Sequence, residues 1–198
     1  MRVALMSSLT DPTELFAGEG EVRAAFRRHD WTATRLGPES TWSPALRSSL
    51  LHVLWSAFPN LVLWGPDLVQ LYNDAYLDLI GDQRLAGLGM PTRESSSHDW
   101  AINEPFYRRV MAGETISREG APFSVSRSGV TENLFLTLSY APIYDENSVV
   151  AGVLVTVFEA EEELFASGQT NPHRDMPPRD RKTPRPPEPF RRRSPATR

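Results

Sequence analysis

Few side chains in this sequence occur in patterns that are typical of catalysis or metal binding. No two of its histidines have the i, i+4 spacing of helical metal ligands, so we expect no metal site. With no cysteine, the chain has no thiolate nucleophile and no disulfide framework. It also has neither a Gly-x-Ser-x-Gly motif nor a glycine-rich nucleotide-binding loop. The four histidines, none of which is placed for catalysis by a neighbouring motif, are His29, His52, His98 and His173. We therefore predict a protein without catalytic activity of its own.

Charged residues gather in two segments near the C-terminus. An acidic run over residues 159–163 is interpreted as the solvated face of a linker helix. Residues 170–198 contain nine Lys or Arg and three Asp or Glu, a net charge of +6, whereas the rest of the chain has a net charge of −10. A basic segment can contact nucleic acid or anionic lipid. This one has a single aromatic residue, Phe190, and no alternation of basic and aromatic residues, so we predict no nucleic-acid binding and interpret it as a non-functional or accidental extension.

The length and composition favour one globular domain. A chain of 198 residues is long enough for one ordinary domain with a full core. No stretch of about 18 apolar residues occurs, which predicts no membrane insertion. The N-terminus lacks the apolar run of a signal peptide, and we expect a cytoplasmic protein. Residues 1–18 and the proline-rich residues 168–198 are expected to be mostly disordered.

The first two thirds of the chain are predicted to be helical around one hairpin. Ser43 and Pro44 are placed as the N-cap and first turn of a helix that Pro59 ends. Two apolar runs, 60–64 and 68–72, flank a Gly-Pro-Asp turn and predict a hairpin. Asn73 is placed to cap the next helix. The predicted helices span residues 21–29, 45–58, 74–80 and 100–112, and residues 81–99 are expected to be irregular.

The last third is predicted to be β-rich, with extended segments at 115–118, 122–127, 131–143 and 149–158. Leu136, Leu138 and Tyr140 alternate with Phe135, Thr137 and Ser139, and we expect them to face the helices together with Val153 and Val155. Residues 145–148 form the last turn, in which Asn147 is expected to take the left-handed conformation. The element order predicts an α+β fold, with one antiparallel sheet and helices on one face.

Six short motifs follow one another along the chain in a characteristic order. They are Leu36-Gly37-Pro38, Trp64-Gly65-Pro66-Asp67-Leu68, Leu71-Tyr72-Asn73-Asp74-Ala75-Tyr76, Ala112-Gly113-Glu114, Ser139-Tyr140-Ala141-Pro142-Ile143 and Gly152-Val153-Leu154-Val155-Thr156-Val157. In this order they resemble a PAS domain, and more closely the PAS domains near the N-terminus of bacterial sensor histidine kinases. The similarity covers roughly residues 19–160. It implies a five-stranded antiparallel sheet, an N-terminal helical lead-in, helices that enclose a pocket on one face, and a sensory or interaction role.

The resemblance divides the chain into a disordered N-terminus (1–18), a helical lead-in (19–58), the PAS domain (59–160), a linker remnant (161–167) and the basic tail (168–198). Such a domain is expected to bind a small ligand or a partner protein and to relay the signal by protein–protein contact. Two alternatives stay open. The chain is the sensor end of a histidine kinase truncated by a frameshift, or it is a dimerisation module with a filled core that pairs with a second copy.

The resemblance also suggests which side chains line the pocket. In some PAS domains a helical histidine binds haem, and His98 is the only candidate here; the alternative is a surface histidine. The absence of cysteine excludes the covalent flavin and cinnamoyl adducts of photochemical PAS types, and the cofactor is left unknown. For the aromatic residues among the pocket candidates, the alternative is that they only pack in the core and contact no ligand. The pocket candidates are Trp64, Tyr72, Asn73, Tyr76, Phe106, Arg109, Leu136 and Tyr140.

Overall fold

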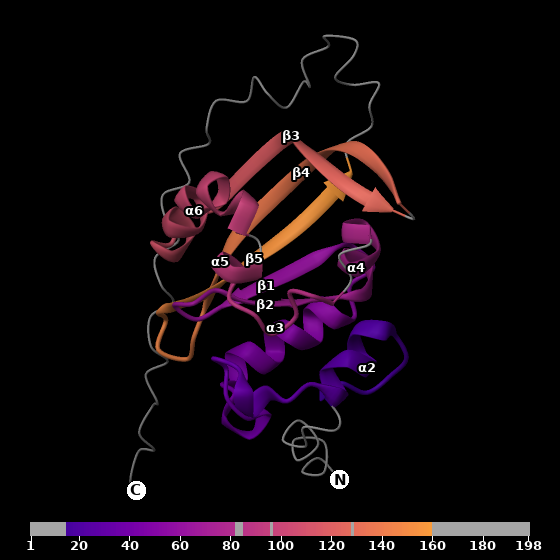
Figure 1. Cartoon of the computed structure of the whole chain (residues 1–198). Helices are drawn as coiled ribbons and strands as arrows, with labels where there is room; N and C mark the ends of the chain where they lie inside the picture. The colour runs from indigo at the N-terminus through magenta and orange to yellow at the C-terminus, as the bar shows by residue number, and fades with distance from the viewer. Residues whose placement is uncertain (1–14, 82–84, 96, 128, 160–198) are drawn as a thin grey trace, which may run out of the picture.

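The structure is a computed structural model that describes residues 15–81, 85–95, 97–127 and 129–159. Its centre is a five-stranded sheet in which all neighbouring strands are antiparallel, in the order β2-β1-β5-β4-β3 (Figure 1). This arrangement confirms the predicted fold class. The strands are β1 (Asn60–Trp64), β2 (Val69–Tyr72), β3 (Ile116–Arg127), β4 (Val130–Tyr144) and β5 (Val150–Glu159).

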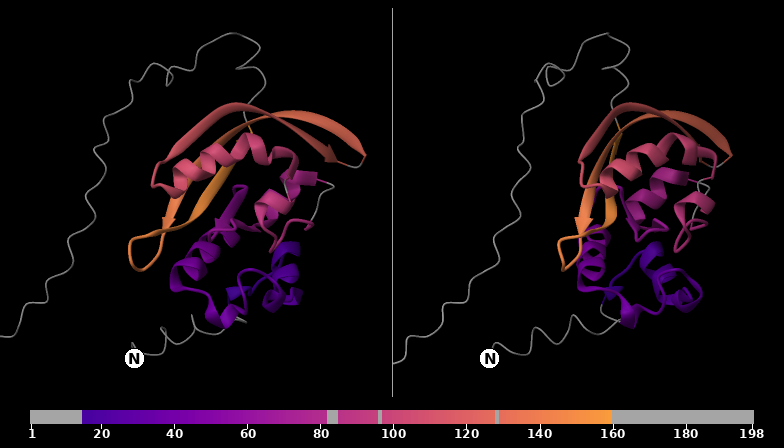
Figure 2. Two further views of the ribbon diagram at one scale, coloured as in Figure 1. Left: turned by 60° about the vertical axis from the view of Figure 1, so that its left-hand side comes forward. Right: turned by 90° about the vertical axis from the view of Figure 1, so that its left-hand side faces the viewer.

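Three helices lie on one side of this sheet, which is called the inner face below (Figure 2). They are α4 (Asp74–Ile80), α5 (Thr92–Ser95) and α6 (Ser97–Met111). The short α5 and the start of α6 fall within the segment that was expected to be irregular. Helix α6 ends before Gly113, whose φ of 98° is a backbone conformation that favours glycine. No helix within the described ranges is long and apolar enough to cross a membrane.

The alternation predicted for the long strands is confirmed. Leu136, Leu138 and Tyr140 are buried on β4, and Val153 and Val155 are buried on β5. The side chain at each position between them on β4 is more exposed, as a period of two requires. The two short segments expected before β4 form one strand, β3, which continues through an irregularity between residues 118 and 121.

The N-terminal segment folds around a group of aromatic rings. It contains α2 (Glu21–Arg28), two short 3-10 turns and α3 (Pro44–Leu54), which packs against β1 and β2. Phe16, Phe26 and Trp31 pack in sequence, with ring centroids 4.8 and 5.1 Å apart. Leu15 and Phe16 are buried, so the folded part begins at least four residues earlier than the expected boundary at residue 19. The large apolar surface of Phe16 explains this difference.

The end of α3 is a second correction. The helix was expected to reach residue 58, but it ends at Leu54. Ser56 Oγ accepts a hydrogen bond from the Phe58 backbone N–H at 3.1 Å, a local turn that competes with helix. Phe58 also precedes Pro59, and a residue before proline avoids helical dihedrals. Phe58 is therefore outside the helix and 57% exposed.

The turn between β4 and β5 is a third correction. Ser148, and not Asn147, has the positive φ, at 63°. The Asp145 carboxylate accepts hydrogen bonds from the backbone N–H groups of Asn147 and Val149, both at 2.8 Å. These bonds hold the turn, and they leave the left-handed position one residue later than expected. They also lower the pKa of Asp145, the bond from Val149 having the largest effect.

Candidate functional site

A small cavity lies between the inner face of the sheet and helices α4 and α6. Its volume is about 100 Å³. The floor is apolar and comes from β1, β4 and β5, while α4, α6 and the far end of β3 form the walls. The lining residues are Leu61, Tyr76, Leu79, Ile80, Asn103, Tyr107, Phe123, Ser124, Val125, Ser126, Leu136, Leu138, Tyr140, Val155 and Val157. The cavity thus combines an apolar floor with several hydroxyl and amide groups, as ligand pockets do.

Three of the sequence-predicted pocket residues line this cavity, namely Tyr76, Leu136 and Tyr140. From α6, the lining residues are Asn103 and Tyr107, whereas Phe106 and Arg109 were predicted. Asn103, Tyr107 and Val110 share one helical face at i, i+4 and i+7, and this spacing was the signal available in the sequence. Because Val110 is fully buried, that face is the one turned to the sheet.

Phe106, Arg109 and Trp64 lie outside the cavity lining. The Phe106 ring is nearly parallel to the Tyr140 ring, with centroids 6.1 Å apart. Arg109 is exposed, and its guanidinium pairs with the Glu114 carboxylate at 2.6 Å. Trp64 closes β1 opposite Gly152, where a Cβ atom would approach the indole to 2.9 Å. The structure gives Arg109 an ion pair and Trp64 a packing contact instead of a place at the cavity.

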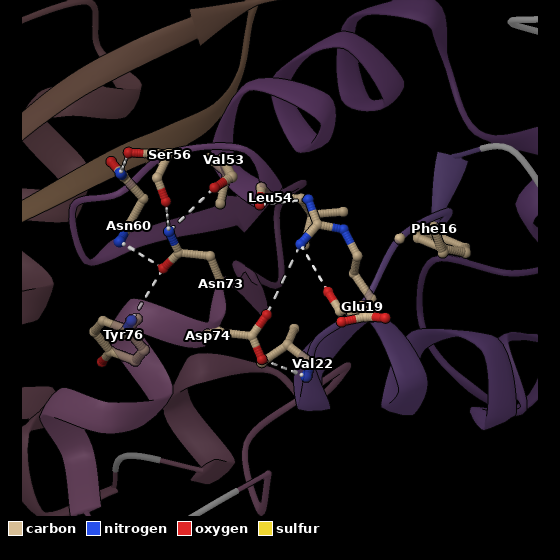
Figure 3. A network of polar contacts seen from close by, with 12 residues as sticks. Phe16, Glu19, Val22, Val53, Leu54, Ser56, Asn60, Asn73, Asp74 and Tyr76 are labelled. Carbon is tan, nitrogen blue, oxygen red and sulfur yellow. Dashed lines mark hydrogen bonds and ion pairs between the residues drawn. The ribbon is translucent and has the colours of Figure 1, made fainter.

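Asn73 is the centre of a polar network that joins α3, β1 and α4 (Figure 3). Its Oδ1 accepts hydrogen bonds from the backbone N–H groups of Asn60 and Tyr76, both at 3.0 Å. The second of these is the predicted N-cap bond of α4. Its Nδ2 donates to backbone carbonyls at the end of α3 and in the following turn. Those carbonyls belong to Val53, Ser56 and Phe58, at 2.8–3.1 Å. Asn73 is buried and organises the backbone rather than lining the cavity.

A second polar contact ties the N-terminal segment to α4. The Asp74 carboxylate accepts a hydrogen bond from the Val22 backbone N–H at 2.8 Å and lies 3.9 Å from the guanidinium of the buried Arg23 (Figure 3). Arg23 also donates to the Leu54 carbonyl at 2.6 Å and stacks over the Trp55 ring. The lead-in is therefore fastened to the first residue of α4, next to Asn73.

Tyr72 lies on β2 and is only 1% exposed. Within the described residues its hydroxyl has no hydrogen-bond partner of normal geometry. Burial raises the pKa of the Tyr72 phenol well above its ordinary value of 10.0; the neighbouring Tyr76 adds to this, and a contact with the Leu88 backbone opposes it. Tyr72 is a core residue next to Tyr76, with ring centroids 5.3 Å apart.

We expect Tyr72→Phe to leave the free energy of unfolding unchanged or to raise it by about 1 kcal/mol at neutral pH, because burying an unpaired hydroxyl is costly. In the wild type, ionisation is easier in the unfolded chain than in the fold, so stability is lost as the pH rises above about 10. The variant lacks this ionisable hydroxyl, so it should lose less stability than the wild type over the same rise in pH. Urea unfolding at neutral and alkaline pH measures both effects, with the exposed Tyr144→Phe as control. A clear loss of stability at neutral pH would contradict the prediction.

The backbone of His98 lies in the first turn of α6. Its side chain is outside the described residues, and a haem role for it stays a prediction. The residues of the linker and basic tail, 160–198, also lie outside the described part of the chain, as do residues 1–14.

Several solved structures are similar to this one. The PAS domain of BvgS from Bordetella pertussis is 22% identical, with a TM-score of 0.46, and the match covers 62% of this chain and 92% of that one. A sensory box sensor histidine kinase from Vibrio cholerae is 17% identical, with a TM-score of 0.41, over 58% of this chain and 90% of that one. An RNA-binding light-oxygen-voltage receptor is 20% identical, with a TM-score of 0.44, over 67% of this chain and 38% of that one.

No model of a known protein family matches the chain, and no curated protein matches it. The strand order β2-β1-β5-β4-β3, the antiparallel pairing and the helices gathered on one face are the features of a PAS domain. The chain has the PAS fold that its sequence motifs predicted.

Proposed function

We propose that this chain is a sensory PAS domain that binds a small molecule in the inner-face cavity and relays the event by protein–protein contact. The observation that carries the proposal is the cavity itself. It lies between the sheet and two helices, and Tyr76, Asn103 and Tyr140 add polar groups to its apolar lining. Such a mixture provides burial for binding and a few directed contacts for specificity. The proposal includes no catalytic step.

The size of the cavity limits the ligand. At about 100 Å³ it is smaller than the 300–1,000 Å³ typical of pockets for drug-sized molecules. A cavity of about 150 Å³ holds benzene. We therefore expect a ligand of about four to six non-hydrogen atoms, far smaller than haem or a flavin.

The signal is relayed through the walls of the cavity, because these walls belong to different elements of the fold. Tyr76 belongs to α4, Asn103 and Tyr107 to α6, and Tyr140 and Val155 to the sheet. A ligand that contacts all three elements favours one arrangement of the helices against the sheet. That arrangement is then read by a partner protein or by a second copy of the chain.

A substitution that fills the cavity tests the proposal. We expect Val155→Phe to eliminate bound small molecules, because the added ring occupies the cavity, and to cost about 1–3 kcal/mol through overpacking. Leu154→Phe on the opposite face of the same strand is the matched control. Native mass spectrometry of the purified proteins, with circular dichroism as a check of folding, measures the outcome. Retention of the same ligand by the folded Val155→Phe variant would place binding elsewhere.

A second candidate function is a dimerisation module with a filled core. It is favoured by Phe58 and Phe158, which are 57% and 41% exposed, with ring centroids 5.5 Å apart. Phe158 alternates with the inward-facing Val157 and so lies on the outer face of the sheet. Exposed aromatic groups of this kind often mark interfaces. A dimer in sedimentation experiments that weakens in Phe158→Ser, together with no bound ligand, would favour this function.

A further inference from the structure

Arg118 is a cation on the inner face, beside the cavity, and it has no acidic partner among the residues that the structure describes. Arg118 of β3 stands opposite Leu138 of β4, and directly opposite residues of an antiparallel pair project to the same face of the sheet. Leu138 lines the cavity, so the Arg118 side chain leaves the sheet on the cavity side. Across the described ranges, Arg118 forms no ion pair with a carboxylate.

Neighbouring side chains from α6 and β4 hold this guanidinium in place. It stacks over the Phe106 ring, 4.7 Å from the centroid, and its Nη1 donates to Asn103 Oδ1 at 3.0 Å. Burial raises the pKa of the Tyr140 phenol, and Arg118, which donates toward that hydroxyl, opposes the rise. Arg118 is half-buried, so its charge is less screened by salt than that of an exposed arginine.

Two of the groups that contact Arg118 also line the cavity, namely Asn103 and Tyr140. Because Asn103 Oδ1 accepts from Arg118, the Asn103 amide N–H groups are left as donors, and within the described residues they donate no hydrogen bond. The Tyr140 hydroxyl is a second donor on a side chain that is 2% exposed. One part of the cavity wall thus combines hydrogen-bond donors with a nearby positive charge.

We propose that the cavity binds a small organic carboxylate, with the Asn103 amide and the Tyr140 hydroxyl as donors and Arg118 as the counter-charge. The apolar floor, including Leu136 and Val155, receives the hydrocarbon part. A carboxylate is the group that such donors and a cation recognise best, because hydrogen bonds to an ionised acceptor are about twice as strong as neutral ones. This inference rests on the proposed ligand-binding function and names its class of ligand.

Butyrate and butyramide are suitable probes, because both have about six non-hydrogen atoms and only butyrate is charged. We expect calorimetric titration of the full chain at constant ionic strength to show butyrate bound at least about tenfold more tightly than butyramide, with millimolar or better affinity. Arg118→Met should remove that preference and leave butyramide binding unchanged. Asn103→Asp places a carboxylate of the protein itself beside Arg118, where it takes the role of the ligand's carboxylate. This variant should therefore lose butyrate binding without a lower thermal midpoint.

The outcomes separate this inference from the function on which it rests. Equal affinity for the two probes, or an unchanged preference in Arg118→Met, overturns the carboxylate class while ligand binding in the cavity stands. Binding of neither probe also overturns it. The proposed sensory function fails only if native mass spectrometry of the wild-type protein, in addition, finds no bound small molecule.

Discussion

Replacing Asn73 by alanine is expected to lower the free energy of unfolding by about 2–4 kcal/mol. The side chain makes five hydrogen bonds and is 1% exposed. Its loss removes the N-cap of α4 and leaves the buried backbone N–H of Asn60 without its side-chain acceptor. Carbonyls at the end of α3 lose their donor in the same step. Since unpaired buried polar groups are costly, the effect should be near the upper end for a single polar side chain.

Urea unfolding of Asn73→Ala measures this effect, with the exposed Asn147→Ala as a matched control that should change stability by less than about 0.5 kcal/mol. Asn73→Asp refines the test. It retains the acceptor for the Tyr76 N–H but turns an amide donor into a second acceptor facing three carbonyls, and it should therefore also destabilise. If Asn73→Ala were as stable as the wild type, the network around Asn73 would not be holding α3 to α4.

Leu138→Ala is expected to cost about 2–5 kcal/mol, the range for truncating a buried leucine. Leu138 is 5% exposed on the inner face of β4, where it borders the cavity. Truncation enlarges that cavity and removes apolar contacts with the facing helices. A wider cavity should also weaken the discrimination between small ligands by size.

Thr137→Ala on the outer face of the same strand is the control, and it should cost less than about 1 kcal/mol because this side chain has no core-packing role. Urea melts of both variants give their free energies of unfolding, and the comparison uses the same dependence of that free energy on urea concentration for both. Similar costs for the two substitutions would mean that the helices relax around the truncated leucine. A greater cost for Thr137→Ala would mean that the outer face of the sheet is also covered in solution.

Local features of the fold were predictable from short stretches of sequence. The alternation of Leu136, Leu138 and Tyr140 determines which face of β4 is buried, because strand side chains alternate with a period of two. The cap of α4 by Asn73 follows from the chemistry of helix N-termini. The turn between β1 and β2 was predictable from its own Gly-Pro-Asp residues, which favour turns. Each of these features depends on neighbours within a few residues.

The composition of the cavity wall was less predictable. Phe106 and Tyr107 are adjacent and both aromatic, but they lie on different faces of α6, and only Tyr107 lines the cavity. Which face turns inward depends on how α6 docks on the sheet. Arg118 illustrates the same limit, because the neighbours that give it a role, Phe106 and Asn103, belong to a different element.

The sequence by itself determined the class of fold, the order of the elements, the buried face of the long strands and the cap of α4. These depend on side-chain periodicity and backbone chemistry, which act over a few residues. Only the tertiary structure decided that Asn73 bridges three elements, that Leu15 and Phe16 belong to the core, and that Arg118 lies beside the cavity. Those properties arise from contacts between residues far apart in the chain, whose geometry is determined by the packing of whole helices on the sheet.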